Sequence, residues 1–158
     1  MPHYALIDCA ADPALYPMIL REVAYKCLFA GAVDPDLISA SPHIVQLESG
    51  SVLHRELMGQ GWARNWGIVC ASEASLWDVR RQLRGNLQVM LPDGQVVLFR
   101  FYDPRVFVPY IEACEAKDLG SWFGQISDYW VPSEGGTLRF RAGPEGVHKQ
   151  VLQPAAAG

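Results

Sequence analysis

The side chains best suited to nucleophilic or metal chemistry are few and scattered along this sequence. The cysteines and histidines, four of each, are Cys9, Cys27, Cys70, Cys114, His3, His43, His54 and His148. No two cysteines have Cys-x-x-Cys spacing, and no histidine lies one helical turn from another histidine or cysteine, so the sequence predicts no metal site. Three of the cysteines lie in apolar runs, where a thiol packs as a small buried hydrophobe. A catalytic Cys/His pair stays open, because its members meet in space rather than in sequence.

Carboxylates offer a second route to catalysis, but the clearest of them has a structural role. Asp103 and Glu112 could act as an acid–base pair. However, Asp103 precedes Pro104, and this order is typical of the first residues of a helix. Glycine-rich phosphate loops, Gly-x-Ser-x-Gly and His-Glu-x-x-His do not occur in the sequence. We therefore expect a protein without catalytic residues, metals or cofactors. The alternative is a small cytoplasmic hydrolase that uses a cysteine or a carboxylate pair.

Tryptophan and arginine stand together at two places that could bind a protein partner. Trp62 and Trp66 flank Arg64 just before an expected strand, and a second group follows the apolar run 96–102. Trp and Arg are enriched where binding energy concentrates in protein interfaces. The predicted partner-binding residues are Trp62, Arg64, Trp66, Arg100, Tyr102, Asp103 and Arg105.

Each of these groups also has a structural interpretation. Trp66 leads directly into a strand, so packing under the sheet is favoured for it, whereas the two interpretations are balanced for Trp62. Arg100 interrupts an apolar strand and needs a partner inside the protein, because an unpaired buried charge is costly. A structural ion pair is therefore favoured over a binding anchor at that corner.

The length and the net charge of the chain limit the classes of protein to which it can belong. The chain has 158 residues and a formal charge of −4, from 13 basic and 17 acidic residues. This length suits one domain, and the acidic balance argues against a nucleic-acid partner. No apolar run approaches the ~20 residues that cross a bilayer, and the N-terminus does not have the pattern of a signal peptide. We expect a cytoplasmic protein with no membrane partner, and the oligomeric state stays open.

Short apolar runs alternate with helix-like segments and place the candidate residues at the ends of strands. Strands are expected at 4–8, 26–30, 43–47, 66–71, 87–91, 96–102, 128–131 and 137–141, and helices at 12–23, 36–40, 52–58, 76–84, 106–114 and 117–125. The alternation favours parallel pairs, and the Pro92–Gly94 turn favours an antiparallel hairpin. We therefore expect an α/β fold with a mixed parallel and antiparallel sheet and helices packed around it.

The boundaries of the domain follow from where the pattern ends. A single domain is expected over residues 1–142, followed by a flexible C-terminal tail over 143–158, where the periodicity stops. Within the domain, the run 96–102 is almost wholly apolar. Such a run is typical of a strand in the middle of a sheet, covered on both faces.

Three segments of the sequence resemble a known protein family when they are taken together. They are Tyr4–Asp8, Gly61–Ile68 and Phe99–Val106, with further matches at Trp77–Arg84, Leu91–Gly94 and Trp122–Gly124. In this order they resemble the effector chaperone, or adaptor, domain of bacterial type VI secretion, long catalogued as a domain of unknown function. The resemblance extends from about Tyr4 to Val131.

The resemblance implies a cytoplasmic, non-catalytic protein with two partners. Members of the family bind one toxic effector before secretion and help load it onto the valine-glycine repeat spike. Many relatives have a helical extension after this domain, thought to engage the effector, whereas only about 27 residues follow Val131 here. The sequence does not determine which effector is bound, which surface contacts each partner, or whether such an extension has been removed. A purely structural oligomer subunit is a third class of function.

Overall fold

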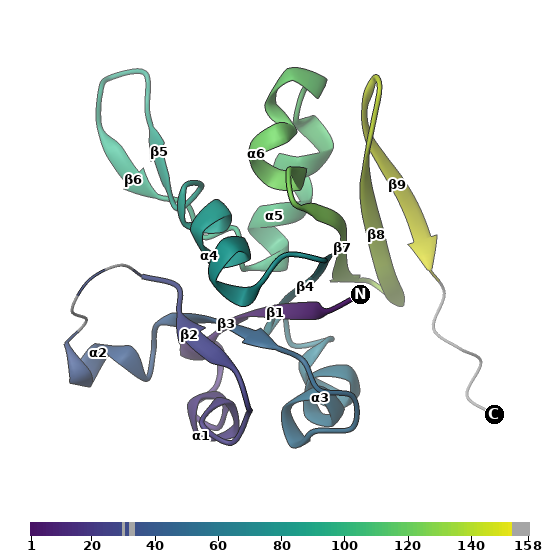
Figure 1. The fold of residues 1–158 in the computed structure, drawn as a ribbon. Helices are drawn as coiled ribbons and strands as arrows, with labels where there is room; N and C mark the ends of the chain where they lie inside the picture. The colour runs from purple at the N-terminus through teal and green to yellow at the C-terminus, as the bar shows by residue number, and fades with distance from the viewer. Residues whose placement is uncertain (30, 32–33, 153–158) are drawn as a thin grey trace.

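A computed structural model describes residues 1–29, 31 and 34–152, which form a seven-stranded sheet between two layers of helices (Figure 1). The strand order is β2-β3-β1-β4-β7-β8-β9. Among the described residues, every pair of neighbouring strands is antiparallel. The strands are β1 (His3–Asp8), β2 (Tyr25–Cys27), β3 (Pro42–Gln46), β4 (Gly67–Ser72), β7 (Ile126–Ser133), β8 (Gly136–Gly143) and β9 (Gly146–Leu152).

The prediction of a single α/β domain is confirmed, but the prediction of parallel pairs is wrong. Strands β1 and β2 run in the same direction because both pair antiparallel with β3. Strands β3 and β4 likewise share a direction because both pair antiparallel with β1. The connections from β1 to β2 and from β3 to β4 therefore join strands of the same direction, as expected, but in each case an antiparallel strand lies between the two. The alternation of strands and helices along the chain does not specify which strand lies between two others in the sheet.

Two helices cover the lower face of the sheet as it is drawn in Figure 1. They are α1 (Leu15–Ile19) and α3 (Val52–Glu56), and a π-helical turn over Leu57–Gly61 continues α3. Their buried side chains pack against the sheet in one apolar cluster that includes Ile7 and Trp66. A short 3-10 turn, Cys9–Ala11, follows β1, and α2 (Pro35–Ile38) precedes β3.

The upper layer contains three helices and the aromatic centre of the protein. These are α4 (Leu76–Arg84), α5 (Pro104–Ala113) and α6 (Gly120–Phe123), with a 3-10 turn at Ala116–Asp118. The ring of Trp122 makes edge-to-face contacts with Phe101 at 5.1 Å and Phe107 at 5.9 Å between centroids. The longest of the three, α5, has ten residues, and no helix in the described ranges is long and apolar enough to cross a bilayer.

The apolar run that suggested a central strand belongs instead to a separate hairpin. Strands β5 (Gln88–Met90) and β6 (Val96–Leu98) pair only with each other around the predicted turn. The next residues, 99–103, turn toward α5, and Phe101 and Tyr102 enter the core there. The prediction of one long, doubly covered strand is therefore wrong, because the apolar residues of this run serve two different elements. The hairpin itself stands away from the main sheet (Figure 1).

The C-terminal part of the chain is more ordered than its sequence pattern indicates. A flexible tail is expected from residue 143, whereas β9 pairs with β8 in register from Gly143↔Gly146 to Thr137↔Leu152. Most side chains of β9 are exposed, which explains why no apolar periodicity marks this strand. The boundary at 142 stays a prediction, and 153–158 lie outside the described residues.

Candidate functional site

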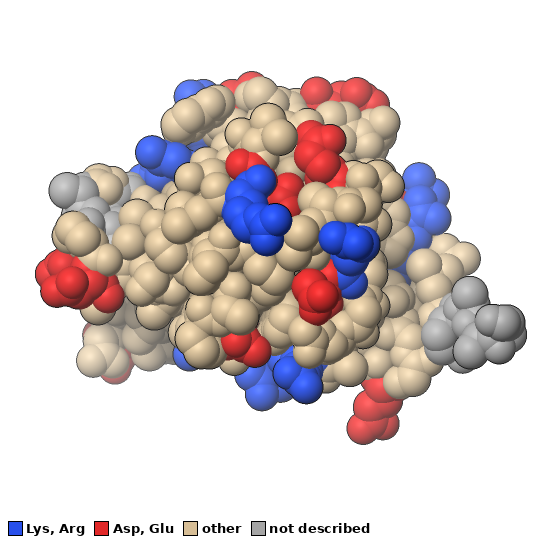
Figure 2. Space-filling view, turned by 90° about the horizontal axis from the view of Figure 1, so that it is seen from below, with Lys and Arg blue, Asp and Glu red and all other residues tan. Residues whose placement is uncertain are grey.

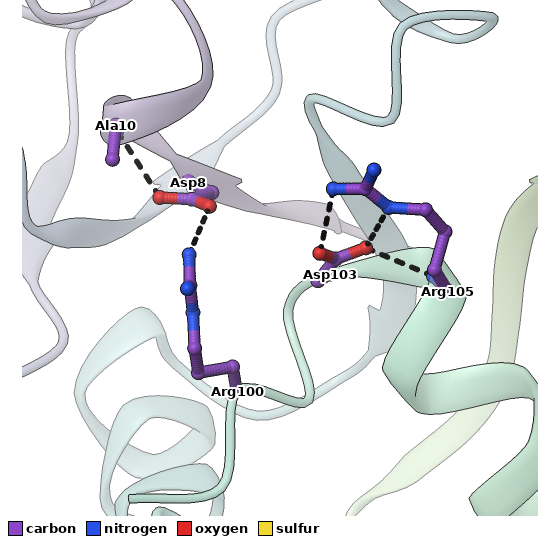
Figure 3. A network of polar contacts seen from close by, with 5 residues as sticks. All are labelled: Asp8, Ala10, Arg100, Asp103 and Arg105. Atoms are coloured by element: carbon purple, nitrogen blue, oxygen red, sulfur yellow. Dashed lines mark hydrogen bonds and ion pairs between the residues drawn. The ribbon is translucent and has the colours of Figure 1, made fainter.

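Two carboxylates and two arginines form a polar corner where β1 ends and α5 begins (Figure 3). In this corner, Arg100 Nη2 donates a hydrogen bond to Asp8 Oδ2 at 3.0 Å. Arg105 binds Asp103 through both carboxylate oxygens, with Nε–Oδ1 at 3.0 Å and Nη2–Oδ2 at 2.9 Å. Both carboxylates are nearly buried, whereas more than half of each arginine side chain is exposed. The corner therefore fixes two guanidinium groups at the protein surface.

Asp103 and Tyr102 have structural roles in this polar corner. Asp103 Oδ1 accepts the backbone N–H of Arg105 at 2.9 Å and so begins α5, as predicted. Burial alone raises the pKa of Asp103, but the hydrogen bonds and charge of Arg105 outweigh it and hold that pKa below its ordinary value. The carboxylate is therefore ionised at neutral pH and is unsuited to act as a general acid. Burial raises the pKa of Tyr102, whose side chain belongs to the core.

The predicted tryptophan–arginine group lies in the turn between the π-helical segment and β4. Trp66 is only 2% exposed and packs in the apolar cluster below the sheet, so in the folded protein it supports this turn and presents no surface. An ideal Cβ at Gly61 would lie 2.1 Å from the Trp66 ring, so glycine makes room for the indole. Arg64 is exposed and Trp62 is half-buried, which leaves these two for a partner.

Asp8 joins the two predicted groups, although it is not among the predicted partner-binding residues. Its backbone N–H donates to the Trp66 carbonyl oxygen at 2.9 Å, and its carboxylate accepts from Arg100. The three segments that carry the family resemblance therefore meet at this residue. Two features of the sequence could have indicated this role. Asp8 ends an apolar strand, and Arg100, within an apolar run, needs a carboxylate partner.

An open groove of about 930 Å³ lies beside Trp62, on the face of the sheet that α3 covers. One wall comes from α3 and the π-helical turn, and the other from β7, β8 and the turn between them. The side chains that shape these walls are His54, Met58, Trp62, Trp130, Pro132 and Thr137. The lining is mainly apolar, with a few polar groups at its edges, as in sites that bind apolar ligand segments.

Both tryptophans of the groove are held in place by their neighbours. Trp62 Nε1 donates a hydrogen bond to Thr137 Oγ1 at 2.8 Å. The Trp130 ring lies 5.2 Å from the His3 ring and 5.4 Å from the Arg139 guanidinium carbon. Fixed aromatic surfaces lose little conformational entropy on binding. Trp130 is not among the partner-binding residues predicted from the sequence. Tyr129 points into the core, and alternation along β7 therefore places Trp130 on the opposite face of the sheet.

Cys9 and His43 form the one Cys/His contact seen among the described side chains, and its geometry does not activate the thiol. Cys9 Sγ lies 3.5 Å from His43 Nδ1, which lies 2.9 Å from the Ser41 carbonyl oxygen. A carbonyl only accepts, so Nδ1 carries the proton and cannot take one from the thiol. Burial, with the charge of Asp8, raises the pKa of Cys9 to about 12, and burial lowers the pKa of His43. Both groups are neutral at pH 7, unlike a catalytic thiolate–imidazolium pair.

Charge does not single out another site on the lower face. Figure 2 shows this face with lysines, arginines and acidic residues scattered among uncharged surface, and with no broad field of one sign. Within the described ranges, no group of three or more His, Cys, Asp or Glu side chains is arranged to hold a metal ion. The groove and the polar corner are therefore the candidate partner-binding features.

Comparison with known protein families identifies the family of this chain. The family described as "Domain of unknown function (DUF4123)" matches residues 3–121. No curated protein and no solved structure matches the chain. The matched range contains the polar corner, the Trp62 turn and α3, whereas the groove wall from β7 and β8 lies beyond it. Because this match covers well over half of the sequence, the chain belongs to the DUF4123 family.

Proposed function

We propose that this protein is a cytoplasmic, non-catalytic adaptor of bacterial type VI secretion. It binds one toxic effector and helps load that effector onto the valine-glycine repeat spike. Membership of the DUF4123 family supports this role, which the family resemblance implies. The buried, protonated Cys9 thiol argues against the cysteine-dependent hydrolase.

The apolar groove is the observation on which the proposal rests. A groove of about 930 Å³ with two fixed indole walls suits an amphipathic helix or an apolar segment of a polypeptide. We infer that the effector exposes such a segment before delivery. Exposed apolar surface promotes aggregation, so covering the segment keeps the effector soluble. We therefore assign the groove to the effector, with Trp62 as the main contact. Arg64, exposed two residues further along the chain, is the predicted charged contact beside it.

The polar corner contributes in a different way. Arg100 and Arg105 are each held by a nearly buried carboxylate, while their outer atoms face solvent. A guanidinium that is already oriented binds a partner carboxylate with less entropic cost than a free one. These arginines are expected to influence partner choice more than affinity.

A co-purification experiment tests the proposed function. The tagged chain is produced together with the effector and spike proteins encoded by neighbouring genes, and the retained partners are quantified. Trp62→Ala is expected to reduce effector retention at least tenfold, because a hot-spot tryptophan contributes about 2 kcal/mol or more. Circular dichroism and urea unfolding confirm that the variant is folded.

Trp77→Ala is the matched control for this experiment. Trp77 is an exposed tryptophan on α4, in the upper layer, so its loss should leave effector retention unchanged. If the folded wild-type chain retains neither partner, the proposed function is wrong. Equal loss of effector from both variants would instead reject the groove as the effector site.

A further inference from the structure

The face of the sheet that lines the groove continues along β8 to two arginines that the proposed function does not use. Thr137 accepts the indole N–H of Trp62 in the groove, and Arg139 and Arg141 follow it at alternate positions of the same strand. Alternate side chains of a strand share one face of the sheet. The register agrees, because Arg139 pairs with Trp130, which lines the groove. The two arginines therefore extend the groove along β8.

These two arginines share a single buried carboxylate. Arg139 and Arg141 each reach Asp128 Oδ1 through Nε, at 2.9 Å and 2.8 Å, and the Asp128 side chain is only 6% exposed. One negative charge thus faces two positive charges, and no other ion pair of either guanidinium is seen in the described ranges. The side chain of Arg141 is 55% exposed. An exposed guanidinium that is already oriented, with its charge only partly compensated, is suited to bind a carboxylate.

A hollow of about 620 Å³ beside Arg141 provides space for such a ligand group. It lies at the end of the sheet where β7 begins and β8 ends. Arg141 and His148, which pair in the register of β8 with β9, line it together with Ser127. Phe123 and Ile126 add apolar lining. This combination suits an acidic side chain, whose carboxylate binds the cation while its methylene groups contact the apolar lining.

Strand geometry sets the distance between the apolar contact and the acidic one. A strand rises about 3.3 Å per residue, so Arg141 lies about 13 Å along β8 from Thr137, the hydrogen-bond partner of Trp62. This length corresponds to about four residues of an extended segment or about nine residues of a helix. The groove and the arginines together therefore select a segment whose apolar and acidic side chains have this separation.

A second copy of this chain is a poor occupant of this face. In the described part of the chain, the β5–β6 hairpin stands away from the main sheet, on the side opposite α3 (Figure 1). A contact between the hairpin of one copy and the groove of another would be head-to-tail. Contacts of this kind build rings or open filaments rather than a closed pair. Light scattering of the free chain is therefore expected to give the mass of a monomer.

We propose that Arg139 and Arg141 form an acidic-residue subsite of the groove, which binds a carboxylate of the effector segment. This inference rests on the proposed function, which assigns the groove to the effector. The apolar side chains of the segment contact Trp62 and Trp130, and an Asp or Glu about 13 Å away binds the Arg141 guanidinium. The subsite selects among apolar segments, because it requires a negative charge at one position.

Salt-dependent binding of the effector to an Arg141 variant tests this inference. Calorimetry measures the affinity of wild type, Arg141→Gln and Arg81→Gln for the effector encoded by a neighbouring gene, at about 0.05 M and about 0.5 M NaCl. Arg141→Gln is expected to weaken binding about tenfold at low salt and less than about threefold at high salt, since salt screens exposed charges. Arg81→Gln makes the same change of net charge at an exposed residue of α4 and should bind like wild type.

Arg141→Lys separates the charge of Arg141 from its contact with Asp128. Lysine keeps a positive charge beside the buried carboxylate but lacks the planar guanidinium. We expect this variant to bind the effector about threefold more weakly than wild type and to keep the salt dependence of wild type. Arg139 still compensates Asp128 in both Arg141 variants, and urea unfolding verifies that each is folded.

The outcomes separate this inference from the proposed function. If wild type binds the effector and folded Arg141→Gln binds it equally well at low salt, the acidic-residue subsite is wrong and the proposed function stands. An equal loss at both salt concentrations, or equal affinity of Arg141→Lys and Arg141→Gln, would also reject recognition of charge. Oligomers of the free chain that Arg141→Gln dissociates would assign this face to a second copy. A wild-type chain that binds no effector overturns both proposals.

Discussion

At the scale of single residues, buried carboxylates organise the polar contacts of this protein. Asp8 links β1 to the Trp66 turn and to Arg100, and Asp103 begins α5 while it binds Arg105. Asp128 on β7 plays the same part toward β8. Its Oδ1 accepts a hydrogen bond from Arg139 Nε at 2.9 Å. The same oxygen forms an ion pair with Arg141 Nε at 2.8 Å. Each carboxylate is nearly buried and depends on its arginine partners for compensation.

The pH dependence of stability reports the Asp128 contacts. Burial raises the pKa of Asp128, but the Ser127 hydroxyl and the two arginines outweigh it and lower that pKa. Because the pKa of Asp128 is lower in the folded protein than its ordinary value of 3.8, ionisation of this carboxyl stabilises the fold at pH values above 3.8. This stabilisation is lost as the pH falls below 3.8 toward the pKa of the folded protein. Asp128→Asn should therefore reduce the unfolding free energy at pH 7 by about 1–3 kcal/mol. The difference from wild type should shrink between pH 4 and about pH 3.

Urea unfolding at a series of pH values measures this difference. Glu134→Gln, at an exposed carboxyl in the β7–β8 turn, is the control and should change stability at pH 7 by less than about 0.5 kcal/mol. A deficit of Asp128→Asn that stays constant from pH 7 to pH 3 would show that ionisation of this carboxyl does not stabilise the fold.

At the scale of secondary structure, local capping signals set the start of most helices. Side-chain oxygens of Asp34, Ser51, Ser75 and Asp103 accept backbone N–H groups at the first turns of α2, α3, α4 and α5. The approach of β4 to β1 is set differently, by the absence of a side chain. An ideal Cβ at Gly67 would lie 2.1 Å from the Leu6 carbonyl oxygen, so only glycine fits at this crossing.

Gly67→Ala is expected to disrupt the pairing of β1 with β4. The added methyl group would collide with backbone that cannot move independently, so we expect a loss of roughly 2–4 kcal/mol in unfolding free energy. Gly59→Ala is the control, since a Cβ there meets nothing within 4 Å and should change stability by less than about 1 kcal/mol. Denaturant unfolding of both variants decides the matter. Equal stability of the two would mean that β4 can shift away from β1.

At the scale of the whole molecule, the sheet separates two apolar clusters of different composition. The upper cluster is rich in aromatic rings around Trp122, and the lower cluster contains Trp66 and the aliphatic side chains of α1 and α3. β9 adds little to either, since Val147 is its one side chain packed against the upper cluster in the described part of the chain. Its contribution is the ladder with β8 and the ion pair of Lys149 with Glu112 at 3.2 Å.

A chain ending at residue 142 tests the domain boundary predicted from the sequence. We expect this chain to fold with the near-ultraviolet circular dichroism of the full protein, because the core residues precede β9. It should unfold at lower urea concentration and aggregate more readily, since the edge of β8 is then exposed. Circular dichroism, urea unfolding and light scattering measure these three properties. Failure of the shortened chain to fold would place the boundary after β9.

Much of the local structure was predictable from the sequence, because its signals act over a few residues. Caps such as Ser75, the Pro92–Gly94 turn and the apolar strands Tyr4–Asp8 and Trp66–Ala71 predicted elements that the structure contains. The family also followed from three short segments, and the match over residues 3–121 agrees with it. These features depend on backbone dihedral preferences and on contacts within one turn of helix or strand.

The tertiary structure alone decided which distant segments meet. Insertion of β1 between β3 and β4 made the sheet antiparallel, and Asp8 became the partner of Arg100, 92 residues away. The groove joins His3 to Leu152, and the hairpin left its apolar residues outside the core. Pairings over such separations depend on chain closure and on competition among many strand partners. They are selected by the free energy of the whole fold, which no local pattern of residues encodes.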